Sequence, residues 1–155
     1  MSLEEKAKKL AELNARSEQF DPIAERNWWI GKLARLRTDV GRWLGPLRQK
    51  GQVTFDSVPL QLSEEKIGTY EVEELVLEFG PEAIVLEPRG TLIAGARGRV
   101  DVFRRGSRME QIMLILSGPT KEEARWEIWP SRDPRQRKPL DQASFEAALD
   151  TLLEV

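Results

Sequence analysis

The spacing of apolar residues changes once along this chain, near Gln52, and this change restricts the fold more than any other feature. Before it, apolar residues recur at steps of three and four, as they do on one side of a helix. This stripe consists of Trp29, Ile30, Leu33, Leu36, Val40, Trp43, Leu44 and Leu47. After it, apolar and polar residues alternate between Pro and Gly, a pattern typical of antiparallel strands joined by turns. The sequence therefore predicts an α+β fold, in which N-terminal helices and a C-terminal helix flank one antiparallel meander sheet.

The first 20 residues predict a helix with little apolar surface to bury. Ser2 and Glu5 have the spacing of a capping box, which starts a helix over about residues 3–17. Its apolar side consists of two leucines and three alanines: Leu3, Ala7, Leu10, Ala11 and Ala15. An isolated helix of this length is marginal in water, so we expect it to need a neighbour. We therefore divide the chain into an N-terminal helical arm, residues 1–20, and a single α+β domain, residues 21–155.

Capping residues predict the limits of two more helices. Asp21-Pro22 provides an N-cap followed by a proline in the first helical position, so a second helix starts there. Gly45-Pro46 is expected to end it, because proline disfavours a helical residue before it, and residues 47–51 are expected to form the exit turn. Asp141 is expected to cap a final helix over about residues 142–153.

Strands are expected where apolar and polar residues alternate. They lie at about 52–56, 58–62, 68–79, 83–87, 91–95, 98–104, 110–116 and 124–129, and residues 131–139 are expected to form a loop. Within residues 68–79, Tyr70 and Val72 have one parity, whereas Leu75 and Leu77 have the other. One extra residue brings both pairs to the same face, so we expect a β-bulge at residues 73–74.

The sequence over residues 98–116 predicts a hairpin, and the alternation of its apolar residues favours one of two possible turns. Val100 and Val102 are expected to face the core, which leaves Arg99, Asp101 and Phe103 on the opposite face. A three-residue turn at 104–106 aligns these valines with the apolar residues of the second strand, whereas a two-residue turn at 106–107 does not. The sequence therefore predicts the three-residue turn.

The chain of 155 residues contains no His and no Cys. The lack of Cys excludes disulfides and thiolate metal sites, and the lack of His removes the commonest metal ligand and the commonest general base. We therefore expect a protein that is not an enzyme and that uses neither a metal nor a cofactor. Its apolar stretches are far shorter than the ~18 residues of a membrane span, and its N-terminus is acidic where a signal peptide starts with positive charge. We expect a cytoplasmic protein without membrane contact.

Charge is segregated along the chain, although the formal net charge is only −2. Residues 24–51 carry seven basic against two acidic residues, and residues 88–108 carry six arginines against Asp101. Between them, residues 52–87 carry nine acidic residues against Lys66. The favoured interpretation is that acidic strands lie beside a basic helix and a basic hairpin and neutralise them within the fold. The alternative is an exposed bipolar surface that docks a partner.

The hairpin resembles in part the metal-binding hairpin of PD-(D/E)xK nucleases, because Asp101 precedes a turn and a second strand. Those enzymes need an acidic residue, one further residue and then a lysine on the second strand, to hold a divalent cation and to act on water. Here Glu110-Gln111 is followed by Ile112, and the strand has no lysine. The sequence therefore does not predict nuclease activity.

A candidate surface for a partner or a nucleic acid is predicted from basic and aromatic residues. Trp129 has the opposite parity to Ile128 and precedes a basic loop, so it either stacks on a base beside phosphate-binding charges or covers the loop. Trp28 cannot share the centre of the stripe with Trp29, so we expect it to be partly exposed at an interface or a flank contact. The candidate surface comprises Trp28, Arg97, Arg99, Arg104, Arg105, Arg108, Trp129, Arg132, Arg135, Arg137 and Lys138.

These observations lead to two functional hypotheses. The lack of a catalytic signature, the segregated charge and the weakly apolar arm favour a non-enzymatic protein-binding or regulatory factor that associates with itself as a homodimer. The alternative is a small nucleic-acid-associated protein that uses the basic hairpin and loop. The negative net charge and the lack of a base-reading motif disfavour this alternative.

Overall fold

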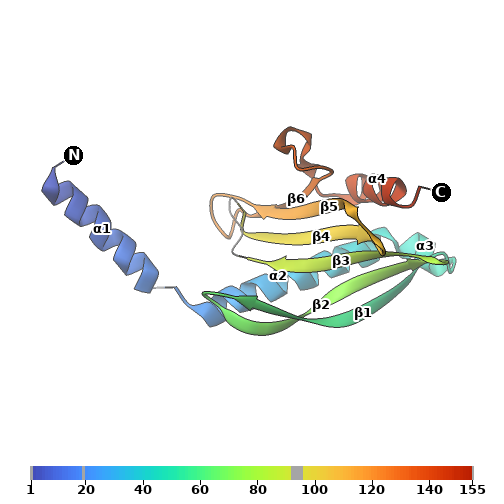
Figure 1. Ribbon diagram of the computed structural model, residues 1–155, viewed down its shortest axis with the longest axis horizontal. Helices are drawn as coiled ribbons and strands as arrows, with labels where there is room; N and C mark the ends of the chain where they lie inside the picture. Colours follow the sequence, from blue (N-terminus) through green and yellow to red (C-terminus); the bar gives the residue numbers. More distant parts are fainter. Residues whose placement is uncertain (1, 19, 92–95, 155) are drawn as a thin grey trace.

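The computed structural model describes residues 2–18, 20–91 and 96–154, and only the backbone of residues 12–18. Its elements are α1 (Leu3–Glu18), α2 (Pro22–Trp43), α3 (Gly45–Gln49), β1 (Thr54–Glu64), β2 (Gly68–Phe79), β3 (Glu82–Gly90), β4 (Gly98–Arg104), β5 (Ser107–Ser117), β6 (Arg125–Trp129), the 3-10 helix η1 (Pro134–Gln136), β7 (Lys138–Pro139) and α4 (Gln142–Leu152). Within these ranges, seven strands form one antiparallel sheet in the order β1-β2-β3-β4-β5-β6-β7 (Figure 1). The predicted α+β fold with a meander sheet is confirmed.

The helices begin at the predicted capping residues. Ser2 and Glu5 exchange hydrogen bonds of 3.2 and 3.3 Å at the start of α1. Asp21 accepts hydrogen bonds from two backbone amides at the start of α2, which satisfies donors that the helix leaves without partners. Asp141 and Ser144 form a capping box at the start of α4.

The end of α2 differs in one detail from the prediction. α2 ends at Trp43, but residues 47–51 do not form only an exit turn, because α3 extends to Gln49. Pro46 lies in the first turn of α3, where its missing N–H costs no hydrogen bond. The chain then turns at Gly51, whose φ of +72° is a conformation that favours glycine.

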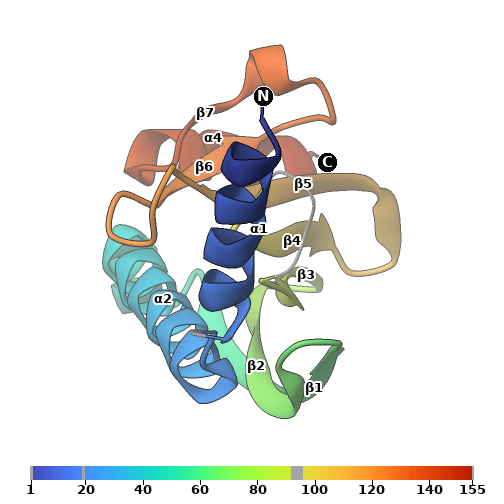
Figure 2. The ribbon, with the colours of Figure 1, turned by 90° about the vertical axis from the view of Figure 1, so that its left-hand side faces the viewer.

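α2 and α4 pack on the same face of the sheet, which curves around the side on which α2 lies (Figure 2). The buried side chains of α2 include Trp29, Leu36, Val40 and Trp43. Phe145 of α4 is fully buried, and its ring centroid lies 5.6 Å from that of Trp43. The predicted stripe is therefore confirmed, although Ile30 and Leu33 at its beginning are only partly covered. In the described part of the chain, no helix is both long enough and apolar enough to cross a membrane.

The first two predicted strands are a single strand, β1. Pro59 lies within it, and the strand tolerates this proline because β1 forms an edge of the sheet and pairs on one side only. The strand predicted at 91–95 falls largely on residues 92–95, which lie outside the described residues. The predicted loop 131–139 contains η1 and the short strand β7.

The β-bulge predicted at residues 73–74 is wrong. β1 and β2 pair in a continuous register from Thr54 opposite Glu78 to Glu64 opposite Gly68. β3 pairs only with residues 75–79 of β2, so the first half of β2 pairs with β1 alone. A two-stranded ribbon twists more strongly than a wide sheet. This twist accounts for the burial of Tyr70 and Val72 in the same core as the later residues of β2, without an extra residue.

The β4–β5 hairpin has the predicted register. Val100 lies opposite Leu114, and Val102 lies opposite Ile112. All four side chains belong to the buried core. Asp101 is placed on the other face of the sheet by strand alternation, as expected.

The predicted three-residue turn at 104–106 is wrong. Arg104 pairs with Ser107, so the turn contains two residues, and Gly106 takes a φ of +89°. The register shifts between this turn and Val102, where residues 108–111 of β5 correspond to Phe103 alone. This irregularity absorbs the mismatch between a two-residue turn and the register that the core residues require.

Candidate binding surfaces

Two buried carboxylates lie side by side on the sheet face opposite α2. Glu87 of β3 is paired in register with Asp101 of β4, and both side chains are more than 90 % buried. Arg89 lies 2.9 Å from Glu87 and 3.8 Å from Asp101, and Arg99 donates a 2.7 Å hydrogen bond to Asp101. Arg108 pairs with Glu87. Buried charges require such partners, so these arginines hold the two carboxylates in the fold.

Glu74 of β2 is a third carboxylate in this part of the sheet, near Glu87, and we refer to Glu74, Glu87 and Asp101 as a row of carboxylates. Burial, followed by the charge of Glu87, raises the pKa of Glu74, whereas Arg108 and Arg105 act in the opposite direction. Arg108 also stacks on Phe103, with 4.2 Å between the guanidinium carbon and the ring centroid. Two predicted surface residues, Arg99 and Arg108, therefore have structural partners.

At the hairpin turn, two adjacent arginines have different environments. Arg104 donates a 2.8 Å hydrogen bond from Nε to Glu82, forms a second 2.8 Å contact through Nη2, and donates to the carbonyl of Glu154. The hydrogen bond from Arg104 lowers the pKa of Glu82. Arg105 is exposed, and its side chain makes no ion pair with any described residue. Arg97, at the other end of β4, donates to the carbonyls of Gly118 and Pro119 at 2.8 and 2.6 Å.

The basic loop after β6 also contains both residues that form ion pairs and residues that do not. Arg135 pairs with Asp133 at 3.0 Å, and Arg137 lies 3.6 Å from Glu127. Glu127 also accepts a 3.4 Å hydrogen bond from the indole of Trp129, which lies on the opposite face to Ile128 as predicted.

Arg132 and Lys138, in the same loop region, are exposed and make no ion pair within the described ranges. Both line a cavity of about 840 Å³ between α4, the start of β5 and the residues after β6. Met109, 98 % exposed, lies at the same cavity.

Trp28 is partly buried against the core, as expected beside the fully buried Trp29. The ammonium groups of Lys32 and Lys121 lie 5.9 and 5.4 Å from its ring centroid. Lys121 also pairs with Glu25 of α2. Trp28 is thus a flank contact that holds the β5–β6 connection against α2.

The segregated charges of the sequence meet across the fold. Arg37 of α2 pairs with Glu73 of β2, and the hairpin arginines described above pair with the acidic β3. Most of the eleven candidate residues therefore have partners within the fold. Among the described residues, the acidic side chains form no group placed to hold a metal ion.

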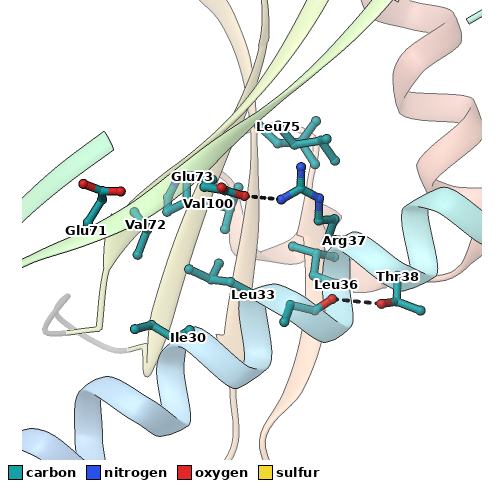
Figure 3. Close-up of a pocket in the computed structure, with 13 residues that line it drawn as sticks. Ile30, Leu33, Leu36, Arg37, Thr38, Glu71, Val72, Glu73, Leu75 and Val100 are labelled. Carbon is teal, nitrogen blue, oxygen red and sulfur yellow. Dashed lines mark hydrogen bonds and ion pairs between the residues drawn. The ribbon is translucent and has the colours of Figure 1, made fainter. Parts of the chain in front are cut away.

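The structure contains a groove that the sequence did not predict. A cavity of about 520 Å³ lies between α2 and the strands β2, β3 and β4, and we refer to it as the α2–β2 groove (Figure 3). Its lining consists of Ile30, Leu33, Ala34, Leu36, Arg37, Thr38, Glu71, Val72, Glu73, Leu75, Leu86, Pro88 and Val100. Ile30 and Leu33 point from α2 toward Val72 of β2, and the Arg37–Glu73 ion pair bridges the two walls at one end. The parity change in β2 lies next to the point where β2 separates from β3, because β3 pairs with β2 only from Leu75 onward.

A polar cluster holds the end of the β1–β2 ribbon near β3. Glu64 accepts hydrogen bonds from the amide and the hydroxyl of Thr91 at 2.8 and 2.9 Å, and from the hydroxyl of Tyr70. Burial and the neighbouring Glu64 raise the pKa of Tyr70. The backbone of Gly90, with φ +130°, lies close to Glu64, and a Cβ on residue 90 would be 2.9 Å from the Glu64 carboxylate. These contacts fix the ribbon in the position that leaves the groove open.

α1 extends away from the sheet and from α2 (Figures 1 and 2). Leu3 is 84 % exposed and Leu10 is 66 % exposed. Ala7 and Ala11 on the same side of the helix are also exposed. The arm therefore presents an uncovered apolar stripe.

Comparisons of this chain with protein-family models, with curated proteins and with solved structures gave no match.

Proposed function

We propose that this protein is a non-enzymatic protein-binding factor that associates with itself as a homodimer, and that α1 contributes to the interface. The exposed leucines of α1 carry this proposal. A helix of 16 residues is marginal in water unless its apolar side packs on another surface. A second copy of the chain supplies such a surface by two-fold symmetry.

Several features support a role without catalysis. The sequence lacks His and Cys, and the buried acids Glu87 and Asp101 are both paired with arginines. The proposal includes a cytoplasmic location, which fractionation of cells that produce the tagged chain tests directly.

Light scattering on the full chain tests self-association. We expect a dimer for the native chain and a monomer for the double variant Leu3→Asp/Leu10→Asp, because charge on the stripe opposes its burial. Both leucines are exposed, so these changes leave the domain intact. Lys9→Asp places the same side chain on the other side of α1 and should remain dimeric. A monomeric native chain at high concentration would refute the proposal.

Nucleic-acid binding is the second candidate. The exposure of Arg105, Arg132 and Lys138, without ion pairs to described residues, favours it. Labelled single-stranded oligonucleotides at ~50 mM salt provide the test, because phosphate contacts weaken steeply as salt rises. Loss of binding in Arg132→Glu/Lys138→Glu would support this candidate, and lack of binding by the native chain would exclude it.

A further inference from the structure

We propose that the α2–β2 groove of one copy receives α1 of a second copy, so that two chains exchange their arms. This inference rests on the self-association proposed above and assigns the surface that α1 binds. The occupant is thus an amphipathic helix of known sequence, in the helix-in-groove mode of recognition.

The floor of the groove is suited to apolar side chains. Leu36, Val72, Leu75 and Val100 form its base and are themselves buried, whereas Ile30 at its mouth is 37 % exposed. Figure 3 shows Ile30 and Leu33 of α2 and Val72 of β2 directed into the space between the two walls, whereas Glu71 lies at its outer rim. The groove's volume of about 520 Å³ leaves room for apolar side chains that project from one side of a helix, not for the whole helix.

α1 carries the pattern that such a groove accepts. Leu3, Ala7 and Leu10 occur at positions i, i+4 and i+7, which lie along one side of a helix. Alanine between the leucines lets the helix axis approach closely. α1 has 16 residues and is therefore ~24 Å long, which exceeds the stretch of α2 from Ile30 to Thr38 that lines the groove.

The charges on both partners are complementary. The β2 wall carries Glu71 and Glu73, and the α2 wall carries Arg37. Glu71 makes no ion pair within the described part of the chain, and in Figure 3 it lies on the far side of Val72 from Arg37. On α1, Lys6 follows Leu3 by three residues and flanks the stripe on one side, while Glu4 flanks it on the other. Lys6 beside Glu71 and Glu4 beside the α2 wall select one direction for the docked helix.

A second copy fits better than the chain's own arm. Three residues separate α1 from α2, and α1 leads away from its own groove (Figure 1). One helix in one groove is a small contact, whereas stable interfaces bury about 1,200–2,000 Å² in total. Exchange of both arms around a two-fold axis doubles the contact and closes the assembly.

Disulfide cross-linking tests the docking directly, because the native chain has no Cys. Leu10→Cys is mixed with a larger, tagged chain that carries Ile30→Cys, and the mixture is oxidised. We expect a covalent product of mixed size. A tagged chain with Arg132→Cys, at the other cavity, is the control and should give little of this product. An equal yield from the control would overturn the proposal. Cross-linking of a Leu10→Cys/Ile30→Cys double variant only within single chains would also overturn it, in favour of the chain's own arm.

A charge exchange provides a second readout in the full chain. Glu71→Lys should raise the dimer dissociation constant about tenfold, because two symmetric contacts are reversed, and Lys6→Glu in the same chain should restore it. Failure of the second change to restore the dimer would contradict the assigned orientation. The mass of the native chain separates the two proposals: a monomer refutes self-association, whereas a dimer without the Leu10–Ile30 cross-link refutes only the groove.

Discussion

The indole ring of Trp29 lies directly over Gly98, so that a Cβ on residue 98 would overlap Cζ3 of the ring. Trp29, in the first half of α2, is fully buried, and Gly98 begins β4. The lack of a side chain at Gly98 therefore sets how closely α2 approaches the sheet.

Gly98→Ala should reduce the free energy of unfolding by about 1–3 kcal/mol or more, because a packed core cannot take up an added methyl group without strain. Gly31→Ala is the matched control in α2. No atom lies within 4 Å of the Cβ it would gain, so it should stabilise the helix by about 0.5–1 kcal/mol. Denaturant unfolding measures both. Equal effects of the two changes would show that Trp29 does not limit the packing.

Leu36→Ala should cost about 2–5 kcal/mol in denaturant unfolding, because Leu36 is buried in the core. Leu33→Ala should cost clearly less, since Leu33 borders the groove and already lacks part of its packing. A larger loss at Leu33 would mean that the groove is filled in solution.

Asp101→Ala should destabilise the fold by about 1–3 kcal/mol, because Arg99 loses its buried hydrogen-bond acceptor. Asp133→Ala removes a carboxylate whose arginine partner is exposed, so its effect should be much smaller. Thermal unfolding of both variants distinguishes a structural network from an accidental surface pair. Similar stabilities would argue against the network.

Arg104→Ala should lower stability more than Arg105→Ala, because Arg104 holds Glu82 and the carbonyl of Glu154. Arg105 is exposed, and its loss should change the free energy of unfolding by less than about 0.5 kcal/mol. If Arg105→Ala proves the more harmful change, the turn relies on contacts other than those described.

Glu74→Gln should remove one pH-dependent contribution to the free energy of unfolding. The pKa of Glu74 is raised in the folded state, so the folded chain holds this proton more tightly than the unfolded chain. Glu74 should therefore contribute stability that is present at low pH and is lost as pH rises from the ordinary pKa of the carboxyl, 4.5, through the raised value. In urea unfolding between about pH 4 and pH 7, the stability of the native chain relative to the variant should fall as pH rises. Glu65→Gln, in an exposed turn, should retain the native dependence.

Local sequence signals predicted the parts of this fold that depend on neighbouring residues. Asp21 and Asp141 cap helices because they lie beside the amides they bind, and the valines of β4 face the core because their parity matches that of β5. The groove and the Glu87–Asp101 row were not predictable in this way. Both depend on how strands that are distant in sequence twist and pair, which a single sequence does not specify.

The ion pairs of the candidate surface residues were only partly predictable for a related reason. Arg108 was predicted as a surface charge because of its position in the hairpin, but its partner Glu87 lies near it only once β3 pairs with β4. Asp101, the partner of Arg99, is two residues away on the same strand, and its burial also depends on the pairing with β3. Basic residues near a turn are expected to be exposed, but exposure does not imply that they lack an ion-pair partner.

The meander order of the sheet also has a kinetic consequence. Because each strand pairs with the one before it, most contacts are local in sequence, and chains of this kind close short loops and fold quickly for their size. The contact between Trp43 and Phe145 is an exception, since it joins α2 to the last helix across the whole sheet. We expect α4 to dock late, so that changes at Phe145 accelerate unfolding and leave the folding rate nearly unchanged.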